Sequence, residues 1–146
     1  REVTIAAIQM SCSRDVKENI EKAAKHKAAA GAGAQIILPS ELFERQYFCQ
    51  ERRYDYYDYA KPLSDNDAVQ SMKALGKGLG VGDPVSFYEA GEGRQLFNSV
   101  AVIDADGEVC RAVQVSAPEG SLSVLLPHTN LRIFYADFNH ELLQKF

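Results

Sequence analysis

The fold is decided near the start of the chain by residues 3–38, which read VTIAAIQMSCSRDVKENIEKAAKHKAAAGAGAQIIL. Val3 to Met10 is a short apolar run rich in β-branched residues, which is typical of a strand. From Asp15 onward apolar residues recur at helical spacing and Gly31 follows them, which predicts an amphipathic helix. Gln35 to Leu38 is a second apolar run of strand length. A strand, a helix and a strand in this order predict a right-handed parallel crossover and therefore an α/β fold.

The chain beyond this crossover continues the α/β pattern. A second amphipathic helix is predicted from about Asp67 to Leu79, and strands are predicted at Val85 to Phe87 and Phe97 to Ile103. The sequence Asp104-Ala105-Asp106-Gly107 is a hairpin signal, so the return strand should run from Glu108 to Val115.

The last thirty or so residues have a different character, and their purpose is not indicated by any motif. Residues 116–121 read as a loop, Leu122 to Leu126 as a brief apolar run and Leu131 to Phe134 as a possible strand. Asn139 to Phe146 reads as one short helix.

Composition excludes several classes of protein. The chain has 146 residues, of which 46% are hydrophobic and 25% charged, which are ordinary globular values, and no apolar stretch approaches the ~20 residues of a membrane span. A net charge of −4 argues against a nucleic-acid partner. The three cysteines are widely spaced and are expected to be free thiols, with no metal site and a cytoplasmic location.

Two groups of residues are candidates for chemistry. Glu41 follows Pro39, just past the end of a predicted strand, where open α/β sheets place their ligand sites; it could equally be an ordinary carboxylate at the start of the next segment. Tyr54, Tyr56 and Asp58 belong to a tyrosine-rich segment that could bind an alkylammonium group through aromatic faces and a carboxylate. The alternative for that segment is a half-buried surface helix that uses its tyrosine rings for packing.

Several motifs resemble the nitrilase superfamily of carbon-nitrogen hydrolases. Residues 3–10 resemble its opening strand, Ile37 to Phe43 its first catalytic motif, and Asn98 to Gly107 its next strand pair. Within the superfamily, segments 41–44, 47–50, 60–62 and 84–87 are most similar to the N-carbamoylputrescine amidases. The resemblance covers about residues 3–109.

This resemblance implies an αββα sandwich whose site holds a Glu, a Lys and a Cys and needs no metal or organic cofactor. The thiol attacks the carbamoyl carbon, the Glu is the general base, and the Lys stabilises the tetrahedral intermediate. The family reaction converts N-carbamoylputrescine and water into putrescine, carbon dioxide and ammonia, a step in polyamine biosynthesis. By position, Glu41 takes the role of the base.

The same resemblance implies that much of the family site is absent from this sequence. Val115 occupies the place of the lysine, and the chain has no Trp with which to match the family's Cys-Trp-Asp motif. We therefore expect the N-terminal part of the αββα sandwich in residues 1–109, with the second half missing or replaced by an unrelated tail at 110–146. Such a chain should be inactive, and it should form homo-oligomers or associate with full-length subunits of the family.

Position also gives an expectation for the environment of Glu41. If the family fold forms, this carboxylate should be buried without the neighbouring ammonium, so its charge should be disfavoured. On that basis Glu41→Gln should stabilise the fold at neutral pH.

Overall fold

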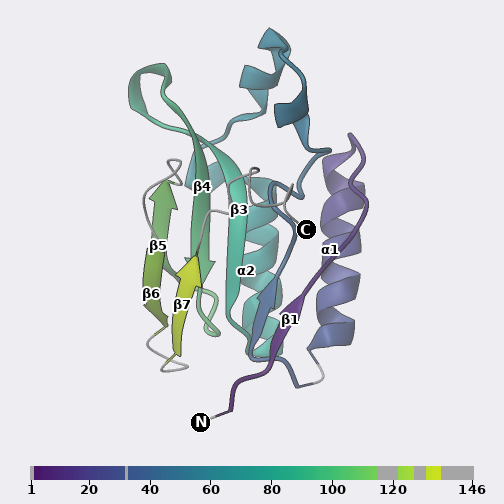
Figure 1. Cartoon of the computed structure of the whole chain (residues 1–146), viewed down its shortest axis with the longest axis vertical. Coiled ribbons are helices and arrows are strands. Elements are labelled where there is room, and N and C mark those ends of the chain that lie inside the picture. Colours follow the sequence, from purple (N-terminus) through teal and green to yellow (C-terminus); the bar gives the residue numbers. More distant parts are fainter. Residues whose placement is uncertain (1, 32, 115–121, 127–130, 136–146) are drawn as a thin grey trace, which may run out of the picture.

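The computed structural model describes residues 2–31, 33–114, 122–126 and 131–135 (Figure 1). The two α-helices are α1 (Val16–Ala30) and α2 (Asp67–Leu79). The strands are β1 (Ile5–Ala7), β2 (Ile36–Leu38), β3 (Asp83–Ala90), β4 (Leu96–Ile103), β5 (Val109–Gln114), β6 (Leu122–Leu126) and β7 (Leu131–Tyr135). Short 3-10 helices occupy Phe48–Gln50, Tyr54–Tyr59, Leu63–Asp65 and Glu92–Arg94.

The first two strands and α1 form the predicted parallel crossover. Strand β1 pairs with β2 in parallel, with Ile5 opposite Ile36. The prediction of a strand over all of Val3 to Met10 was too long, because the regular pairing covers only three residues of each strand. Beyond it, the Ile8 amide still donates to the Leu38 carbonyl at 2.8 Å.

Strands β3, β4 and β5 form an antiparallel sheet that continues the first one. Strand β4 lies between β3 and β5. A parallel bridge between Ile36 and Gly82, with the Ile37 amide donating to the Gly82 carbonyl at 3.0 Å, joins β2 to the start of β3. The strands therefore follow one another across the molecule in the order β1-β2-β3-β4-β5, as Figure 1 shows.

Both helices begin and end where the sequence predicts, because side chains satisfy free backbone groups at their starts and glycine amides do so at their ends. The Asp15 carboxylate accepts a hydrogen bond from the Glu18 amide at 3.0 Å, and the Asn66 side chain accepts one from the Val69 amide at 2.9 Å. At the end of α2, Gly80 adopts the left-handed conformation with φ of 66°, and its backbone amide donates a hydrogen bond to the Gly76 carbonyl. These are the usual N-cap and C-cap arrangements.

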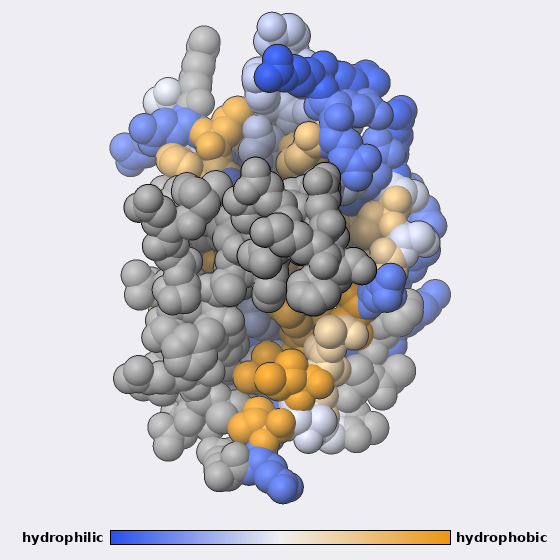
Figure 2. Space-filling view, in the orientation of Figure 1, coloured by the Kyte–Doolittle hydropathy of each residue, from blue (hydrophilic) through white to orange (hydrophobic). Residues whose placement is uncertain are grey.

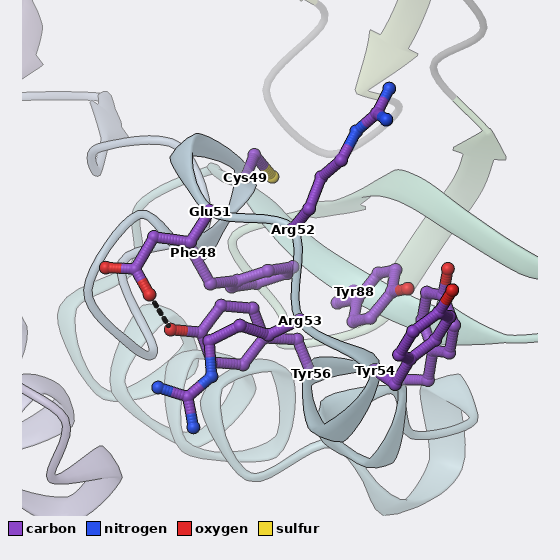
Figure 3. A pocket seen from close by; sticks show the side chains of 9 residues that line it. Phe48, Cys49, Glu51, Arg52, Arg53, Tyr54, Tyr56 and Tyr88 are labelled. Carbon is purple, nitrogen blue, oxygen red and sulfur yellow. Dashed lines mark hydrogen bonds between the residues drawn. The ribbon is translucent and has the colours of Figure 1, made fainter.

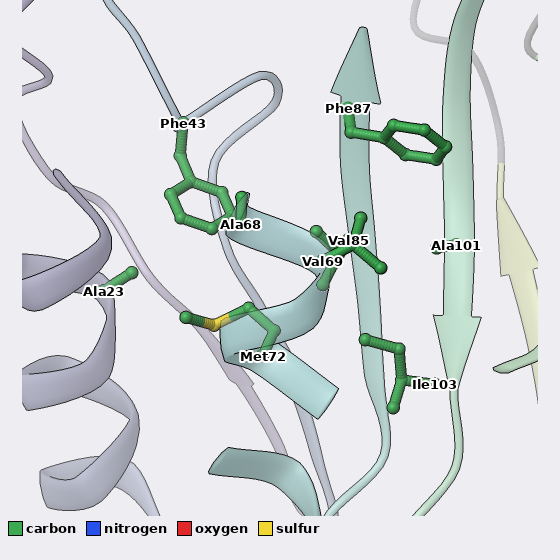
Figure 4. Close-up of a cluster of buried hydrophobic side chains, with 9 residues drawn as sticks. All are labelled: Ala23, Phe43, Ala68, Val69, Met72, Val85, Phe87, Ala101 and Ile103. Atoms are coloured by element: carbon green, nitrogen blue, oxygen red, sulfur yellow. The ribbon is translucent and has the colours of Figure 1, made fainter. Parts of the chain in front are cut away.

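The main core lies between the two helices and the β3–β4 part of the sheet (Figure 4). Its nine residues are all fully buried and come from α1, the loop after β2, α2 and the two strands: Ala23, Phe43, Ala68, Val69, Met72, Val85, Phe87, Ala101 and Ile103. Each large side chain in this set stabilises the fold by about 1.5–3 kcal/mol through burial. The helical layer is thereby fixed on one face of the sheet.

The hairpin between β4 and β5 confirms the turn predicted at residues 104–107. The Gly107 amide donates to the Asp104 carbonyl at 2.9 Å, and Gly107 has φ of 82°. A Cβ atom there would lie 2.9 Å from the Lys73 carbonyl oxygen, so glycine is needed for conformation and for space. The return strand starts at Val109, and Val115 lies outside the described residues.

Part of the C-terminal segment forms a further antiparallel pair of strands. Strands β6 and β7 pair antiparallel, with Leu122 opposite Tyr135, which confirms the possible strand expected at Leu131 to Phe134. The loop expected at 116–121 and the helix expected at 139–146 lie outside the described residues. A boundary between two regions near residue 109 stays a prediction.

Apolar side chains reach the surface at the β1–β2 end of the sheet. Ile5 is 64% exposed and Leu38 is 38% exposed. Figure 2 shows hydrophobic surface in the lower part of this view of the molecule. Within the described ranges, no helix combines the length and hydrophobicity needed to span a membrane.

Candidate active site

The loop that follows β2 is held in place by hydrogen bonds to backbone carbonyls near the start of the chain. The Ser40 hydroxyl donates to the Ile8 carbonyl at 3.1 Å, and the Gln46 amide donates to the Ser13 carbonyl at 2.8 Å. Between these two anchors Leu42 has φ of 49°, the only positive φ of a non-glycine residue in the described part of the chain. A leucine adopts this conformation only where the surrounding contacts enforce it.

A buried polar network joins the same loop to both helices. The Glu44 carboxylate is 6% exposed and accepts a hydrogen bond from the Asn66 amide at 2.8 Å. The Glu44 carbonyl accepts one from the Asn19 side chain at 3.0 Å, and Asn19 is fully buried. Sequence reasoning missed this network, although an asparagine at a core-facing position of α1 was an available signal.

Glu41 projects from this loop at the carboxyl end of β2, as predicted, but its side chain is exposed. The Asn98 amide of β4 donates to Glu41 Oε1 at 2.6 Å. The expected burial of Glu41 is therefore wrong, because the loop after β2 buries Leu42, Phe43 and Glu44 and leaves the Glu41 side chain in solvent. Sequence reasoning also missed Asn98, which is 57 residues away along the chain.

No lysine or arginine forms an ion pair with Glu41 within the described residues. The nearby Arg45 guanidinium instead lies 4.0 Å from the centre of the Tyr59 ring. The charge of Glu41 acts on the thiol of Cys49. Burial is the larger cause that raises the pKa of this thiol, and the Glu41 carboxylate is the second. This is the opposite of the environment that activates a cysteine nucleophile.

The other two cysteines are also free thiols without activation. Burial raises the pKa of Cys12, partly opposed by Lys22. Burial and the neighbouring carboxylates of Asp104 and Asp106 raise the pKa of Cys110. None of the three cysteines therefore has a stabilised thiolate, and among the described residues no group of His, Cys, Asp and Glu is arranged to hold a metal ion.

A pocket of about 620 Å³ lies beside Cys49, between the tyrosine-rich segment and β3 (Figure 3). Four tyrosines, one phenylalanine and four polar or charged residues line it: Tyr54, Tyr56, Tyr57, Tyr88, Phe48, Cys49, Glu51, Arg52 and Arg53. The predicted binding residues Tyr54 and Tyr56 are among them, whereas Asp58 is not. Glu51, which sequence reasoning did not single out, is the carboxylate in the lining.

The two predicted tyrosines have different environments. Tyr56 is 4% exposed, packs edge-on against Phe48 with ring centres 5.7 Å apart, and donates its hydroxyl to Glu51 at 2.7 Å. Arg53 already lies over its ring, 5.1 Å from the centre. Tyr54 is 87% exposed, and its ring makes one edge-to-face contact, with Tyr57, at 6.0 Å between ring centres. The segment thus combines the two alternatives: Tyr56 packs as a core residue, and Tyr54 remains available to a ligand.

The sequence matches the family described as "Carbon-nitrogen hydrolase" over residues 4–117. The chain is 44% identical to the N-carbamoylputrescine amidase of Arabidopsis thaliana over 108 residues, which cover 73% of this chain and 36% of that protein. It is 36% identical to the citrullinase of Francisella tularensis over 108 residues, covering 73% of this chain and 37% of that protein. The chain therefore spans little more than a third of the length of these relatives.

Solved structures of the same family share the fold. The carbon-nitrogen hydrolase of Helicobacter pylori G27 superimposes with a TM-score of 0.69 at 19% identity, covering 77% of this chain and 39% of that one. Saccharomyces cerevisiae Nit3, described as a member of branch 10 of the nitrilase superfamily, also gives a TM-score of 0.69, at 17% identity, covering 84% of this chain and 51% of that one. The described elements are thus a fragment of the nitrilase fold, and the chain belongs to the carbon-nitrogen hydrolase family.

Proposed function

We propose that this chain supplies the general-base side of a site that hydrolyses N-carbamoylputrescine or a closely related carbamoyl amine, with Glu41 as the base. The observation that carries the proposal is the position of Glu41: exposed at the carboxyl end of β2, on an anchored loop, and held by Asn98. The relatives named as N-carbamoylputrescine amidases support the substrate class. In such a reaction the base takes the proton of a thiol nucleophile and later activates water.

We also propose that these 146 residues do not turn over substrate by themselves. The raised pKa values of Cys12, Cys49 and Cys110 support this view, because a thiol that stays protonated is a poor nucleophile. Incubation of the chain with N-carbamoylputrescine should release no ammonia above background. Turnover that disappears in Cys49→Ala would contradict the proposal and identify Cys49 as a nucleophile.

A chimaera tests the role of Glu41 directly. The matching segment of the Arabidopsis relative is replaced by this chain's residues, so that the relative supplies the rest of the site. The chimaera should release ammonia from N-carbamoylputrescine, and Glu41→Gln in the grafted segment should lower kcat by about 100-fold or more. Glu21→Gln, an exposed carboxylate of α1, is the matched control. A Glu41→Gln chimaera with full activity would refute the assignment of the base.

The pocket beside Cys49 is the place we propose for the amine-bearing end of the substrate. The exposed ring of Tyr54 and the carboxylate of Glu51 support cation binding there. Calorimetric titration with putrescine should show millimolar binding that weakens in Tyr54→Ala and Glu51→Gln. Asp58→Asn tests the residue predicted from the sequence: weaker binding in this variant alone would move the cation site away from the pocket lining.

The exposed Ile5 and Leu38 favour a second candidate function, association with full-length subunits of the family. Light scattering after size-exclusion chromatography should then show an assembly, and replacing both residues by Ser should yield a monomer. A wild-type chain that stays monomeric and leaves the activity of added full-length enzyme unchanged would exclude this candidate.

A further inference from the structure

We propose that Asn98 and Ser86 are positioning residues that hold the Glu41 carboxylate in a fixed orientation for proton transfer. This inference rests on the proposed role of Glu41 as general base and adds two residues, from β4 and β3, that the family resemblance does not assign.

Three hydrogen bonds form a ring that starts and ends at neighbouring loop residues. The Leu42 amide donates to Ser86 Oγ at 3.4 Å, and Ser86 Oγ lies 3.2 Å from Asn98 Oδ1. Asn98 Nδ2 donates to Glu41 Oε1 at 2.6 Å. In the register of β3 and β4, Ser86 pairs with Val100 and Asn98 with Tyr88, so the two side chains are diagonal neighbours on one face of the sheet.

The chemistry of the donors fixes the direction of this ring. A backbone amide can only donate, so Ser86 Oγ accepts from Leu42 and has its single proton free for Asn98 Oδ1. With its oxygen engaged by Ser86, the Asn98 side chain presents its NH₂ group to Glu41. Each donor in the series therefore points toward the Glu41 carboxylate. The bond from Asn98 to Glu41 has a charged acceptor, so it is stronger than a hydrogen bond between neutral groups.

The ring occupies one carboxylate oxygen and leaves the other available. Among the described residues only Asn98 is hydrogen-bonded to Glu41, through Oε1. A general base needs one free oxygen aimed at the proton it accepts, and a second contact that prevents rotation of the carboxylate. The left-handed φ of Leu42 next to Glu41 is a further sign that the loop is forced into one shape here.

The first test uses the chain itself and does not depend on activity. In a ¹⁵N-labelled sample the Asn98 side-chain amide protons should shift between neutral and acidic pH, because protonation of Glu41 removes the charge from the group that accepts their hydrogen bond. The shift should disappear in Glu41→Gln. The size of this pH-dependent shift should fall by about half or more in Ser86→Ala, because the Asn98 side chain loses the hydrogen bond that orients it. Asn98 signals that ignore pH, or that respond equally in Glu41→Gln, would overturn the proposal.

Controls separate positioning from folding. Ser99→Ala changes the neighbouring residue of β4, whose hydroxyl contacts Glu89 instead, and it should leave the Asn98 titration unchanged. Thermal melting monitors the fold of every variant. If Asn98→Ala melts together with the Ser99→Ala control, its effects on Glu41 are not due to unfolding. If it does not fold, Asn98→Asp, which keeps the size but replaces the donor, takes its place.

The second test measures the consequence for catalysis in the chimaera. Asn98→Ala should lower kcat by between about 10-fold and 100-fold with little change in KM, since it misaligns the base without removing a substrate contact. An unchanged kcat would refute the positioning role. If the Glu41→Gln chimaera is itself fully active, the proposed function fails, whereas the ring is still judged by the titration in the chain.

Discussion

Two carboxylates at opposite ends of the parallel strands β2 and β3 show how differently this fold uses a negative charge. Asp83 stands at the start of β3 and is fully buried, and its partner is the equally buried Lys27 of α1. Glu41 follows the end of β2 and is exposed, with a neutral amide as its partner. Because β2 and β3 run parallel, the start of β3 and the end of β2 lie at opposite ends of the strands.

The difference shows which charge is structural and which is available for chemistry. Burial lowers the pKa of the Lys27 ammonium to about 7. Its ion-pair partner Asp83 is equally buried, so each charge depends on the other. A buried pair of this kind makes both residues intolerant of single substitution. Glu41 has no such dependence, since solvent and Asn98 stabilise it, and its removal should affect reactivity far more than folding.

The largest expected effect is the loss of one partner of the buried pair. Lys27→Met should lower the free energy of unfolding by about 3–5 kcal/mol, because it leaves Asp83 buried without a counter-charge. Urea denaturation measures the change. The double variant Lys27→Met with Asp83→Leu should recover most of the loss. A double variant as unstable as the single one would show that packing, not charge pairing, determines stability at this site.

The scaffold beneath Glu41 should contribute a smaller amount. Asn66→Ala removes the N-cap of α2 and the donor to the buried Glu44, so unfolding should become easier by about 1–3 kcal/mol. Asn66→Asp keeps the cap but places a second carboxylate against Glu44, and it should be destabilising as well. Urea denaturation of Asn66→Ser, which keeps a cap and a possible donor, provides the mild control. An Asn66→Ala variant of parental stability would mean that the loop is held by other contacts.

Substitution of Glu41 itself should barely change stability. Glu41→Gln keeps an oxygen that can accept from Asn98 and lies in solvent, so the free energy of unfolding should change by no more than about 0.5 kcal/mol. The expectation from the sequence, that Glu41→Gln stabilises the fold, assumed a buried Glu41 and no longer applies. Urea denaturation at neutral pH decides between the two, since a clear gain in stability would restore the desolvation argument.

The smallest expected effect is on the reactivity of Cys49. A raised thiol pKa means less thiolate at a given pH, so Cys49 should react with iodoacetamide at about pH 8 more slowly than an unhindered cysteine. Glu41→Gln removes one cause of the raised pKa and should speed the reaction by about twofold. The rates are measured with Cys12 and Cys110 replaced by Ser, and Glu21→Gln is the control. If Cys49 reacts at the same rate with and without Glu41→Gln, the Glu41 charge does not contribute to the raised pKa of the thiol.

Local sequence signals predicted the regular elements well. The bounds expected for α2 agree with the structure, because Asn66 and Gly80 supply caps that the sequence carries at both ends. The turn ending at Gly107 was equally predictable from its composition. By contrast, β1 proved shorter than its apolar run, since the length of a strand depends on the residues with which its partner can pair.

The site was only half predictable. The place of Glu41 past the end of β2 followed from chain order and from resemblance. Its exposure did not, because solvent contact depends on how the loop sits on the sheet. Asp58 is absent from the pocket lining for a similar reason, because the 3-10 helix at Tyr54–Tyr59 determines which of its side chains face inward. The carboxylate in the lining comes instead from Glu51, which precedes this helix.

The sequence by itself determined the alternation of strand and helix, the caps, the β4–β5 turn and the membership of a family, since each depends on residues close together in the chain or on a contiguous motif. Tertiary structure alone decided that Lys27 meets Asp83, that Asn19 and Asn66 converge on Glu44, and that Asn98 reaches Glu41. Partners 22 to 57 residues apart are brought together only when the helices pack on the sheet. The physical reason is that a polar side chain within a protein must find a partner, and which partner it finds is a property of the packed fold rather than of the local sequence.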